Sequence, residues 1–370
     1  MTSDLSSELA LKLERARQLL EKYSVDGLLL RRASSFAWAT AGAASYVNTA
    51  SSEGASTLLI TRDGLHLVTS NIEAPRLEQE EGLAAQGWQW HIGHWWEGQA
   101  ALTRLIEGMR LAADVPFSGA RDVSADMARL RALLTPAEGE RFRQLGRLCA
   151  AAMAAAARSV RPGMSELEIA ARLGEETQQR GVQPIVNLVA TDERMLHYRH
   201  PLPTAKTLQR YALLVLSGRK AGLVCSISRL VHFGPMPAAT RTRVEAALHV
   251  NAALISATRP GRGLGEILAA GQAAYAAAGF PEEWRNHHQG GMTGYEPREY
   301  LALPASADLV QAGQAVAWNP SLAGAKVEDT ILVGQAANEI ITAIPGWPVD
   351  EITAAGASVS IACPQVLIVD

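Results

Sequence analysis

Histidines, glycines and a charged pair are concentrated in the stretch NHHQGGMTGYEPRE, residues 286–299. These residue types suit metal binding or acid–base chemistry, because imidazole binds metals and also titrates near neutral pH. The spacing matches neither the HExxH pattern of a zinc-binding helix nor a closed cluster of histidine and cysteine ligands. Three interpretations are therefore open: a metal site, the remains of one, or a site that works without metal.

The two adjacent histidines are expected to differ in orientation. If this stretch is a strand, His287 and His288 point to opposite faces, so at most one of them faces a pocket. We favour His288 for that place, with His287 as the second choice. Gly291 and Gly294 carry no side chain, and we expect them to leave room for a substrate.

Ordered elements must position these side chains. The pattern of apolar residues predicts a helix over 6–23 and strands over 26–32 and 56–68, the last with a hairpin turn at RDG. A long helix is predicted from Pro136 to about Val160, and Ser165 with Glu168 is typical of the start of the next helix. Further strands are predicted at 184–190, 211–218, 222–228, 315–322 and 326–333, and a further helix at 242–261. We predict two domains, residues 1–130 and 131–370.

Composition restricts the class of partner. The 370 residues are 48% hydrophobic and 19% charged, with a net charge of −3, which argues against binding to a nucleic-acid backbone. No apolar run is long enough to cross a bilayer, and the charged N-terminus lacks the apolar core of a signal peptide. Three separate cysteines without a CxxC motif suit a reduced cytoplasm, where we expect the protein to be.

Several phrases, taken in their order along the chain, carry a resemblance to a known superfamily. The phrases are DGLLLRRASSFAWATAGAASYV, RPGMSELEIA, SISRLVHFGPMP, the 286–299 stretch and KVEDTILV. The chain resembles, over nearly its whole length, the creatinase, aminopeptidase P and methionine aminopeptidase superfamily. This resemblance implies an α/β N-terminal domain followed by an α+β pita-bread catalytic domain. It also implies a homodimer whose N-terminal domain caps the neighbour's site, and makes Tyr46 a candidate to reach across.

Metalloenzymes of this superfamily hold two divalent metals with two Asp, one His and two Glu, and the resemblance locates each of these places. The two Asp fall at Ser217 (or Val215, if no gap is allowed) and Ser226, the His at Gly291, the first Glu at Asn319, and the last Glu is kept as Glu328. Hydroxyls, an amide and a bare glycine cannot replace carboxylates as ligands of two hard dications. We therefore expect neither a metal nor another cofactor.

The resemblance to creatinase, which works without metal, implies a histidine base at His197, with His200 as a neighbour or support. An imidazole in a pocket can both take and return a proton. Glu328 is the second catalytic candidate, since it could pair with an attacking water or a substrate ammonium, and His288 is the third. Asn319 is expected to help orient the water or the substrate amine.

Other polar residues are expected to bind the substrate. Arg298 suits a carboxylate or a carbonyl because its planar fork binds two oxygens, and Glu299 beside it is a further substrate-binding candidate. A structural pair between Arg298 and Glu299 is the alternative. Tyr295 could donate to an oxyanion or simply pack in the core. Ser217 and Ser226 are expected to line the pocket, because no base is placed to activate either as a nucleophile.

These residues favour a metal-independent, creatinase-like hydrolase or lyase that cleaves a C–N bond in a small polar metabolite. Two alternatives stay open, namely an Xaa-Pro metallopeptidase similar to aminopeptidase P and a non-catalytic binding protein with a peptidase fold.

Overall fold

The structure, a computed structural model, describes residues 2–370. Contacts within the chain divide it into two compact units. Unit 1 comprises Met1–Ala137 and Ala221–Leu223, and unit 2 comprises Glu138–Lys220 and Val224–Asp370. Within residues 2–370, no helix combines the length and the apolar character that crossing a membrane would require.

Unit 1 is built on a mixed six-stranded sheet in the order β4-β3-β2-β1-β5-β6. The strands are β1 (Gly27–Arg32), β2 (Glu53–Thr61), β3 (Leu65–Ser70), β4 (Gln89–Gly93), β5 (Leu111–Ala113) and β6 (Ala120–Asp122). The helices are α1 (Thr2–Tyr23), α2 (Ala33–Ala39), α3 (Ala74–Gln79), α4 (Ala100–Leu105) and α5 (Ser124–Ala132), with short 3-10 turns η1 (Leu83–Gln86) and η2 (Trp95–Glu97). The predicted hairpin is present, since β2 pairs antiparallel with β3.

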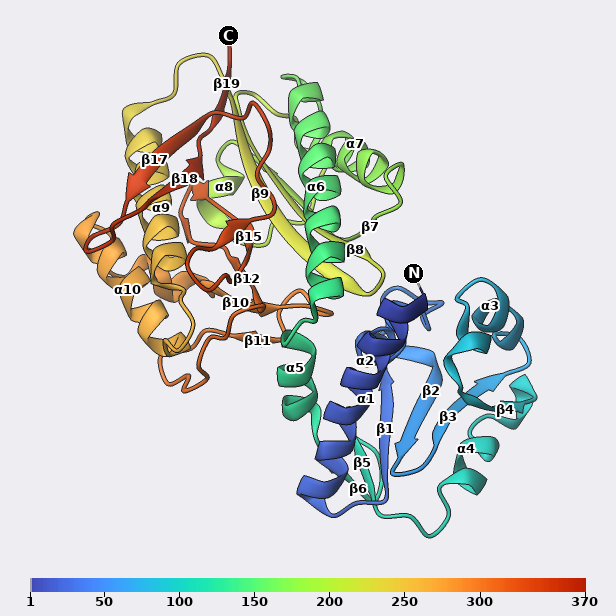
Figure 1. The fold of residues 1–370 in the computed structure, drawn as a ribbon. Helices are drawn as coiled ribbons and strands as arrows, with labels where there is room; N and C mark the ends of the chain where they lie inside the picture. The colour runs from blue at the N-terminus through green and yellow to red at the C-terminus, as the bar shows by residue number, and fades with distance from the viewer. Residues whose placement is uncertain (1) are drawn as a thin grey trace. The chain divides into compact units, whose positions relative to one another are not determined.

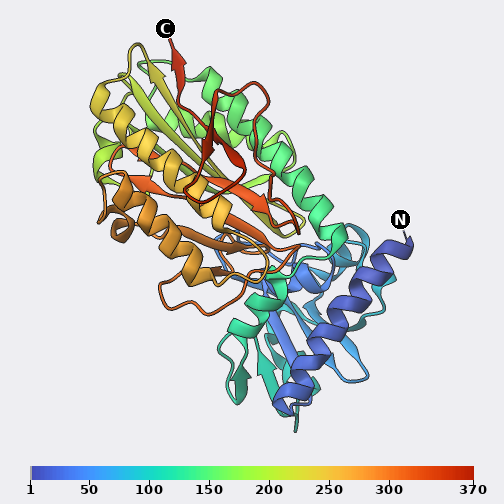
Figure 2. The same cartoon turned by 60° about the vertical axis from the view of Figure 1, so that its left-hand side comes forward.

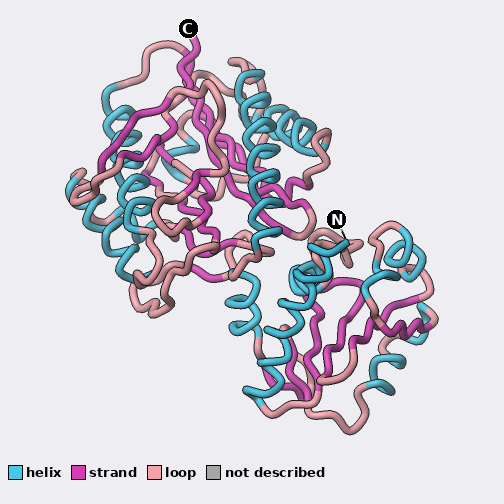
Figure 3. The backbone as a smooth tube through the Cα atoms, viewed as in Figure 1, coloured by secondary structure: helices cyan, strands magenta, loops and turns pink. Residues whose placement is uncertain are grey.

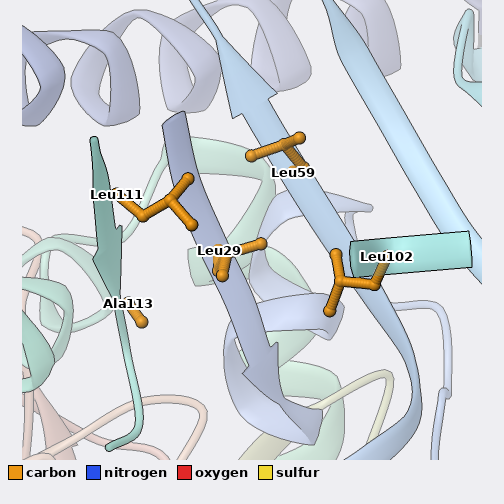
Figure 4. Close-up of a cluster of buried hydrophobic side chains, with 5 residues drawn as sticks. All are labelled: Leu29, Leu59, Leu102, Leu111 and Ala113. Atoms are coloured by element: carbon orange, nitrogen blue, oxygen red, sulfur yellow. The ribbon is translucent and has the colours of Figure 1, made fainter. Parts of the chain in front are cut away.

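A leucine-rich cluster forms part of the core of unit 1 (Figure 4). It joins Leu29 of β1, Leu59 of β2 and Leu111 of β5 to Leu102 of α4, all of them buried. Burying such side chains removes apolar surface from water, which is the main force that holds a sheet and its covering helices together.

Unit 2 places strands between two groups of helices, α6 with α7 and α9 with α10 (Figures 1 and 2). Its helices are α6 (Pro136–Ser159), α7 (Glu166–Gln178), α8 (Arg194–His197), α9 (Ala238–Ala257), α10 (Leu264–Ala277) and the 3-10 turn η3 (Glu283–Asn286). Its strands are β7 (Gln183–Thr191), β8 (Tyr211–Lys220), β9 (Leu223–Phe233), β10 (Gly290–Thr293), β11 (Tyr300–Leu301), β12 (Ala315–Trp318), β13 (Ser321–Leu322), β14 (Ala325–Lys326), β15 (Asp329–Leu332), β16 (Glu339–Ile340), β17 (Val349–Thr353), β18 (Ser360–Pro364) and β19 (Leu367–Val369).

Two of the sheets in unit 2 carry or adjoin the candidate site residues. One has the order β19-β9-β8-β7 and the other β11-β10-β12-β15-β16. A single antiparallel bridge between Ser228 and Glu328 links β9 to the segment just before β15. Loops enter and leave these strands, as the pink segments of Figure 3 show, and two of the loops carry histidines.

The start of α7 agrees with the prediction from sequence. Ser165 is the N-cap, its Oγ accepts from the Glu168 backbone N–H at 3.2 Å, and Glu168 accepts from the Ser165 N–H at 2.7 Å. This reciprocal capping satisfies backbone donors that the first helical turn leaves unpaired.

Candidate active site

Glu328 lies at the centre of a buried group of charged and hydroxyl side chains in unit 2. Its Oε1 accepts from Arg298 Nη2 at 3.0 Å, and its Oε2 accepts from Ser228 Oγ at 2.6 Å. Lys326 Nζ lies 3.3 Å from the same Oε2, and both Lys326 and Glu328 are buried. One carboxylate is thus held between two cations.

Two further serines extend this group from the neighbouring strands. Ser217 of β8 and Ser226 of β9 are buried with their hydroxyl oxygens 2.9 Å apart. Arg298 Nη1 lies 3.4 Å from Ser226 Oγ, so the hydroxyl pair is connected to the guanidinium that binds Glu328. We call Ser217, Ser226, Ser228, Arg298, Lys326 and Glu328 the Glu328 group.

The electrostatics of this group keep Glu328 ionised. Burial by itself raises the pKa of the Glu328 carboxyl, but the nearby Lys326 and Arg298 charges and the Ser228 hydrogen bond lower it to about 2. The adjacent Asp329 pairs instead with Arg229 at 2.8 Å. Burial raises the pKa of Asp329 despite that pair.

Three imidazoles come together in unit 2 from two separate segments, and we call His200, His287 and His288 the histidine cluster. The Nε2 atoms of His200 and His287 are 3.1 Å apart. The ring of His288 lies 4.5 Å from that of His287 and 5.8 Å from that of His200, between centroids. One ligand atom from each residue can be chosen so that all three lie within 4.8 Å of one another.

The cluster is oriented by neighbouring hydrogen bonds. His287 Nδ1 is 3.1 Å from Ser321 Oγ, which leaves its Nε2 directed at His200. Ser321 is held in turn by Tyr275, whose hydroxyl accepts from the Ser321 N–H at 2.9 Å. His288 Nδ1 is buried and has no hydrogen-bond partner among the residues that the structure describes.

Burial is the main reason why the pKa values of these histidines are lowered. It lowers the pKa of His287 to about 2 and that of His288 to about 4. The Lys326 charge adds to the effect on both, and the Arg298 charge adds to the effect on His288. The pKa of His200, which is only partly shielded from water, is lowered by that partial desolvation and then by the Lys326 charge. Neutral imidazoles, able to accept a proton or a metal, are therefore the dominant form at neutral pH.

Two of the sequence-based expectations in this stretch are wrong. His287 and His288 do not diverge to opposite faces, because strand β10 begins only at Gly290 and both rings precede it in irregular backbone. Gly291 does not leave room for a substrate, since a Cβ there would lie 2.3 Å from the carbonyl oxygen of Tyr300 and 2.8 Å from Leu301 Cα. The backbone of β11 takes up that space.

The predicted base, His197, lies outside the histidine cluster as defined. It is exposed at the end of α8. Its ring lies 6.2 Å from the ring of Tyr198, measured between centroids. His200 lies beside His287 instead. A catalytic role for His197 stays a prediction.

The remaining predicted residues are distributed over several places. Asn319 is buried, and its side-chain Oδ1 has no partner among the described residues. Tyr295 donates its hydroxyl to Glu138 at 2.6 Å, and Glu299 accepts from the Tyr295 backbone N–H at 2.9 Å. Tyr46 is half-buried in the loop before β2 of unit 1.

The donor set does not fit the two metals that the superfamily implies. Of the five places, four hold a serine, a serine, a glycine and an amide, and no side chain can be accommodated at Gly291 without moving β11. The one carboxylate, Glu328, is already bound by Arg298 and Lys326. Two positive side chains therefore lie where the ligand set would have to bind dications, which repels them.

Sequence reasoning missed Lys326, Ser228 and Ser321 and undervalued His200. Lys326 could have been found, because it stands two residues before Glu328 and alternate residues of an extended segment share one face. Ser228 and Ser321 could not, since their partners lie far away along the chain.

A family model described as metallopeptidase family M24 matches residues 140–335 of the chain. No curated protein matches the chain. Among solved structures, the Xaa-Pro dipeptidase from Bacillus anthracis is 20% identical with a TM-score of 0.77, over 98% of this chain and 100% of that one. The prolidase from Pyrococcus horikoshii OT3 is 17% identical with a TM-score of 0.77, over 90% and 98%.

The N-terminal domain of FACT complex subunit SPT16 from Cicer arietinum is also similar, at 12% identity and a TM-score of 0.71, over 92% of this chain and 97% of that one. Identities this low show a shared fold and leave the activity open. The predicted superfamily and the two-part pita-bread fold are confirmed.

Proposed function

Because the chain belongs to metallopeptidase family M24, we propose that it is a hydrolase that cleaves a C–N bond of a small polar substrate without the paired metals of its superfamily. The observation that carries this proposal is the position of Arg298 and Lys326 on either side of Glu328. Fixed cations can stabilise negative charge that develops on a substrate oxygen, which is the part a metal plays elsewhere.

His200 is the proposed base in place of His197. It is solvent-accessible and is hydrogen-bonded to His287, whose other nitrogen contacts Ser321. In the proposed reaction a neutral imidazole takes a proton from water, whose oxygen bonds to the substrate carbon. The C–N bond then breaks, and the imidazolium returns the proton to the leaving nitrogen.

Two groups are available to bind the substrate. Arg298 Nε and Asn319 Oδ1 are buried with no hydrogen-bond partner among the described residues, so one can donate and the other can accept. A substrate with both an acceptor oxygen and an N–H would satisfy them, and amidino and ureido acids carry both. An unactivated peptide bond is a poorer substrate when no Lewis acid is present.

The second candidate is a metal-dependent Xaa-Pro dipeptidase. The matched family is described as metallopeptidases, and two of the similar structures are a prolidase and an Xaa-Pro dipeptidase. The comparisons favour this candidate, whereas the donor set around Glu328 favours the first.

Hydrolysis assays on the full-length protein separate the two. Protein purified without chelator would be tested on Xaa-Pro dipeptides and on a panel of amidino and ureido acids, before and after treatment with EDTA. We expect turnover of a panel compound that EDTA does not reduce. Dipeptide turnover that EDTA abolishes and Mn²⁺ restores would establish the second candidate instead.

Single substitutions then identify the base. We expect His200→Ala to lower kcat by roughly 10²- to 10⁴-fold, the usual contribution of a general base. His249→Ala, at an exposed position on α9, is the matched control and should leave kcat unchanged. A comparable loss in His197→Ala but not in His200→Ala would return the role to His197.

A further inference from the structure

We propose that the histidine cluster binds one divalent transition-metal ion, such as zinc, through one nitrogen from each of its three imidazoles. This site is separate from the superfamily's paired-metal site, because none of its ligands occupies any of the five places described above. It also goes beyond the proposed function, which requires no metal.

The spacing of the cluster suits a single tetrahedral ion. Zinc–nitrogen bonds of about 2.0–2.1 Å at tetrahedral angles place two ligand nitrogens roughly 3.3 Å apart. The Nε2 atoms of His200 and His287 are already 3.1 Å apart. The third nitrogen lies within 4.8 Å of the others, so a modest rotation of the His288 ring completes the set.

The surroundings of His287 and His288 support this assignment. A metal-binding histidine usually gives its second ring nitrogen to a fixed hydrogen-bond partner. Ser321 provides that partner for His287, and Tyr275 holds Ser321 through its backbone. His288 Nδ1 is buried without a partner among the described residues, so a bound ion would satisfy a group that is otherwise unpaired.

The ligand chemistry also selects the ion. Imidazole suits zinc, copper, cobalt and nickel, whereas magnesium and manganese prefer carboxylate oxygens, which the cluster lacks. The neighbouring Lys326 and Arg298 repel a cation, but Glu328 is bound to both and offsets one of their two charges. His200 is exposed, which leaves a path for the ion and an open side for its fourth ligand.

Cobalt serves as the probe because tetrahedral Co²⁺ absorbs visible light strongly. The full-length protein, first freed of metal by EDTA and dialysis, is titrated with CoCl₂. We expect a visible band that saturates at one Co²⁺ per chain, and that Zn²⁺ abolishes and excess Mg²⁺ does not. Absence of the band, or saturation at a stoichiometry well below one, would overturn the proposal.

Variants establish that the ion is at this cluster. Loss of an outer partner typically weakens metal binding 10- to 100-fold, so His287→Gln and His288→Gln should each weaken Co²⁺ binding by at least about 100-fold. His249→Gln is the control and should bind as the parent does. Equal affinity in the parent and both cluster variants would show that the ion binds elsewhere.

Ser321→Ala keeps all three imidazoles, so it tests the site even if the histidine variants fail to fold. It should weaken Co²⁺ binding about 10- to 100-fold, because only the orientation of His287 is lost. An unchanged affinity in Ser321→Ala, in protein whose circular dichroism matches the parent, would count against the assigned geometry.

Activity measured in the same samples keeps the two proposals apart. If the proposed function holds, zinc bound to His200 occupies the base, and turnover falls as the site fills. If turnover rises with bound metal, the site stands and the metal-independent function fails. If turnover persists and no metal binds, the function stands and the site fails.

Discussion

Glu328 is the residue on which the Glu328 group depends electrostatically. It is buried, and it contacts Arg298, Lys326 and Ser228 at 3.3 Å or less. Because Lys326 is itself buried, its ammonium has little water to replace the carboxylate if that is removed. The same carboxylate is therefore expected to matter for stability as well as for any reaction.

Glu328→Gln should lower the free energy of unfolding by about 3–5 kcal/mol, the usual cost of leaving buried charges without their partner. Urea unfolding at neutral pH measures this change. The double variant Glu328→Gln/Lys326→Met should recover part of the loss, because one uncompensated cation is then gone. A change within about 0.5 kcal/mol in the single variant would contradict this account of the group.

At the scale of elements, α7 holds the chain on both sides of His200. Glu166, in the first turn of α7, is buried and accepts from the Thr191 N–H at 2.8 Å and the Thr204 N–H at 3.0 Å. It also pairs with Arg194. One carboxylate thus holds together the end of β7, the helix α8 and the middle of the loop that carries His200.

Removal of the Glu166 charge should loosen this loop. We expect Glu166→Gln to lower the free energy of unfolding by about 2–3 kcal/mol at neutral pH, since charge-assisted hydrogen bonds are lost while Arg194 stays partly solvated. Turnover should fall too, because His200 is no longer held. The matched control is Glu168→Gln in the same helical turn, because a glutamine there can still accept from the Ser165 N–H and keep the capping box.

The pH dependence of this effect has a definite sign. The hydrogen bonds and Arg194 lower the pKa of Glu166 below its ordinary value of 4.5, although burial opposes them. A lowered folded pKa means that the stabilisation is present above about pH 4.5 and is lost as pH falls through the folded pKa. The difference between parent and Glu166→Gln should therefore shrink as the pH falls below about 4.5. A difference that grows as the pH falls would refute the assignment.

At the scale of the whole molecule, the chain has the superfamily's fold but other residues at the places where the resemblance expects metal ligands. TM-scores of 0.77 to peptidase structures coexist with a donor set that lacks four of the five expected ligands. The backbone of β11 also lies close to Gly291 and leaves no space for a side chain there. A shared fold does not fix the chemistry, so the fold alone does not decide between the two candidate functions.

Manganese should accordingly fail to stabilise the full-length protein. A ligand present at 100 times its Kd stabilises the folded state by roughly 2.7 kcal/mol, so a bound pair of ions would raise Tm measurably. We expect Tm to be the same with MnCl₂ and with NaCl at equal ionic strength, measured by calorimetry. A rise in Tm that depends on Mn²⁺ concentration would point to a paired-metal centre.

The sequence by itself determined the features that depend on neighbouring residues. The capping box of α7 and the hairpin between β2 and β3 could both be recognised from residue types and short spacings. Local hydrogen bonds and turn geometry involve only a few consecutive residues, so they leave a readable pattern.

Only the tertiary structure decided which chemical groups meet. His200 and His287 are 87 positions apart, and Ser228 and Glu328 are 100 apart. Their contacts follow from how two sheets and two loops pack, and they leave no short-range spacing to recognise. For the same reason His197 and His200 could not be told apart from sequence, since a three-residue difference at the end of a short helix decides which ring joins the cluster.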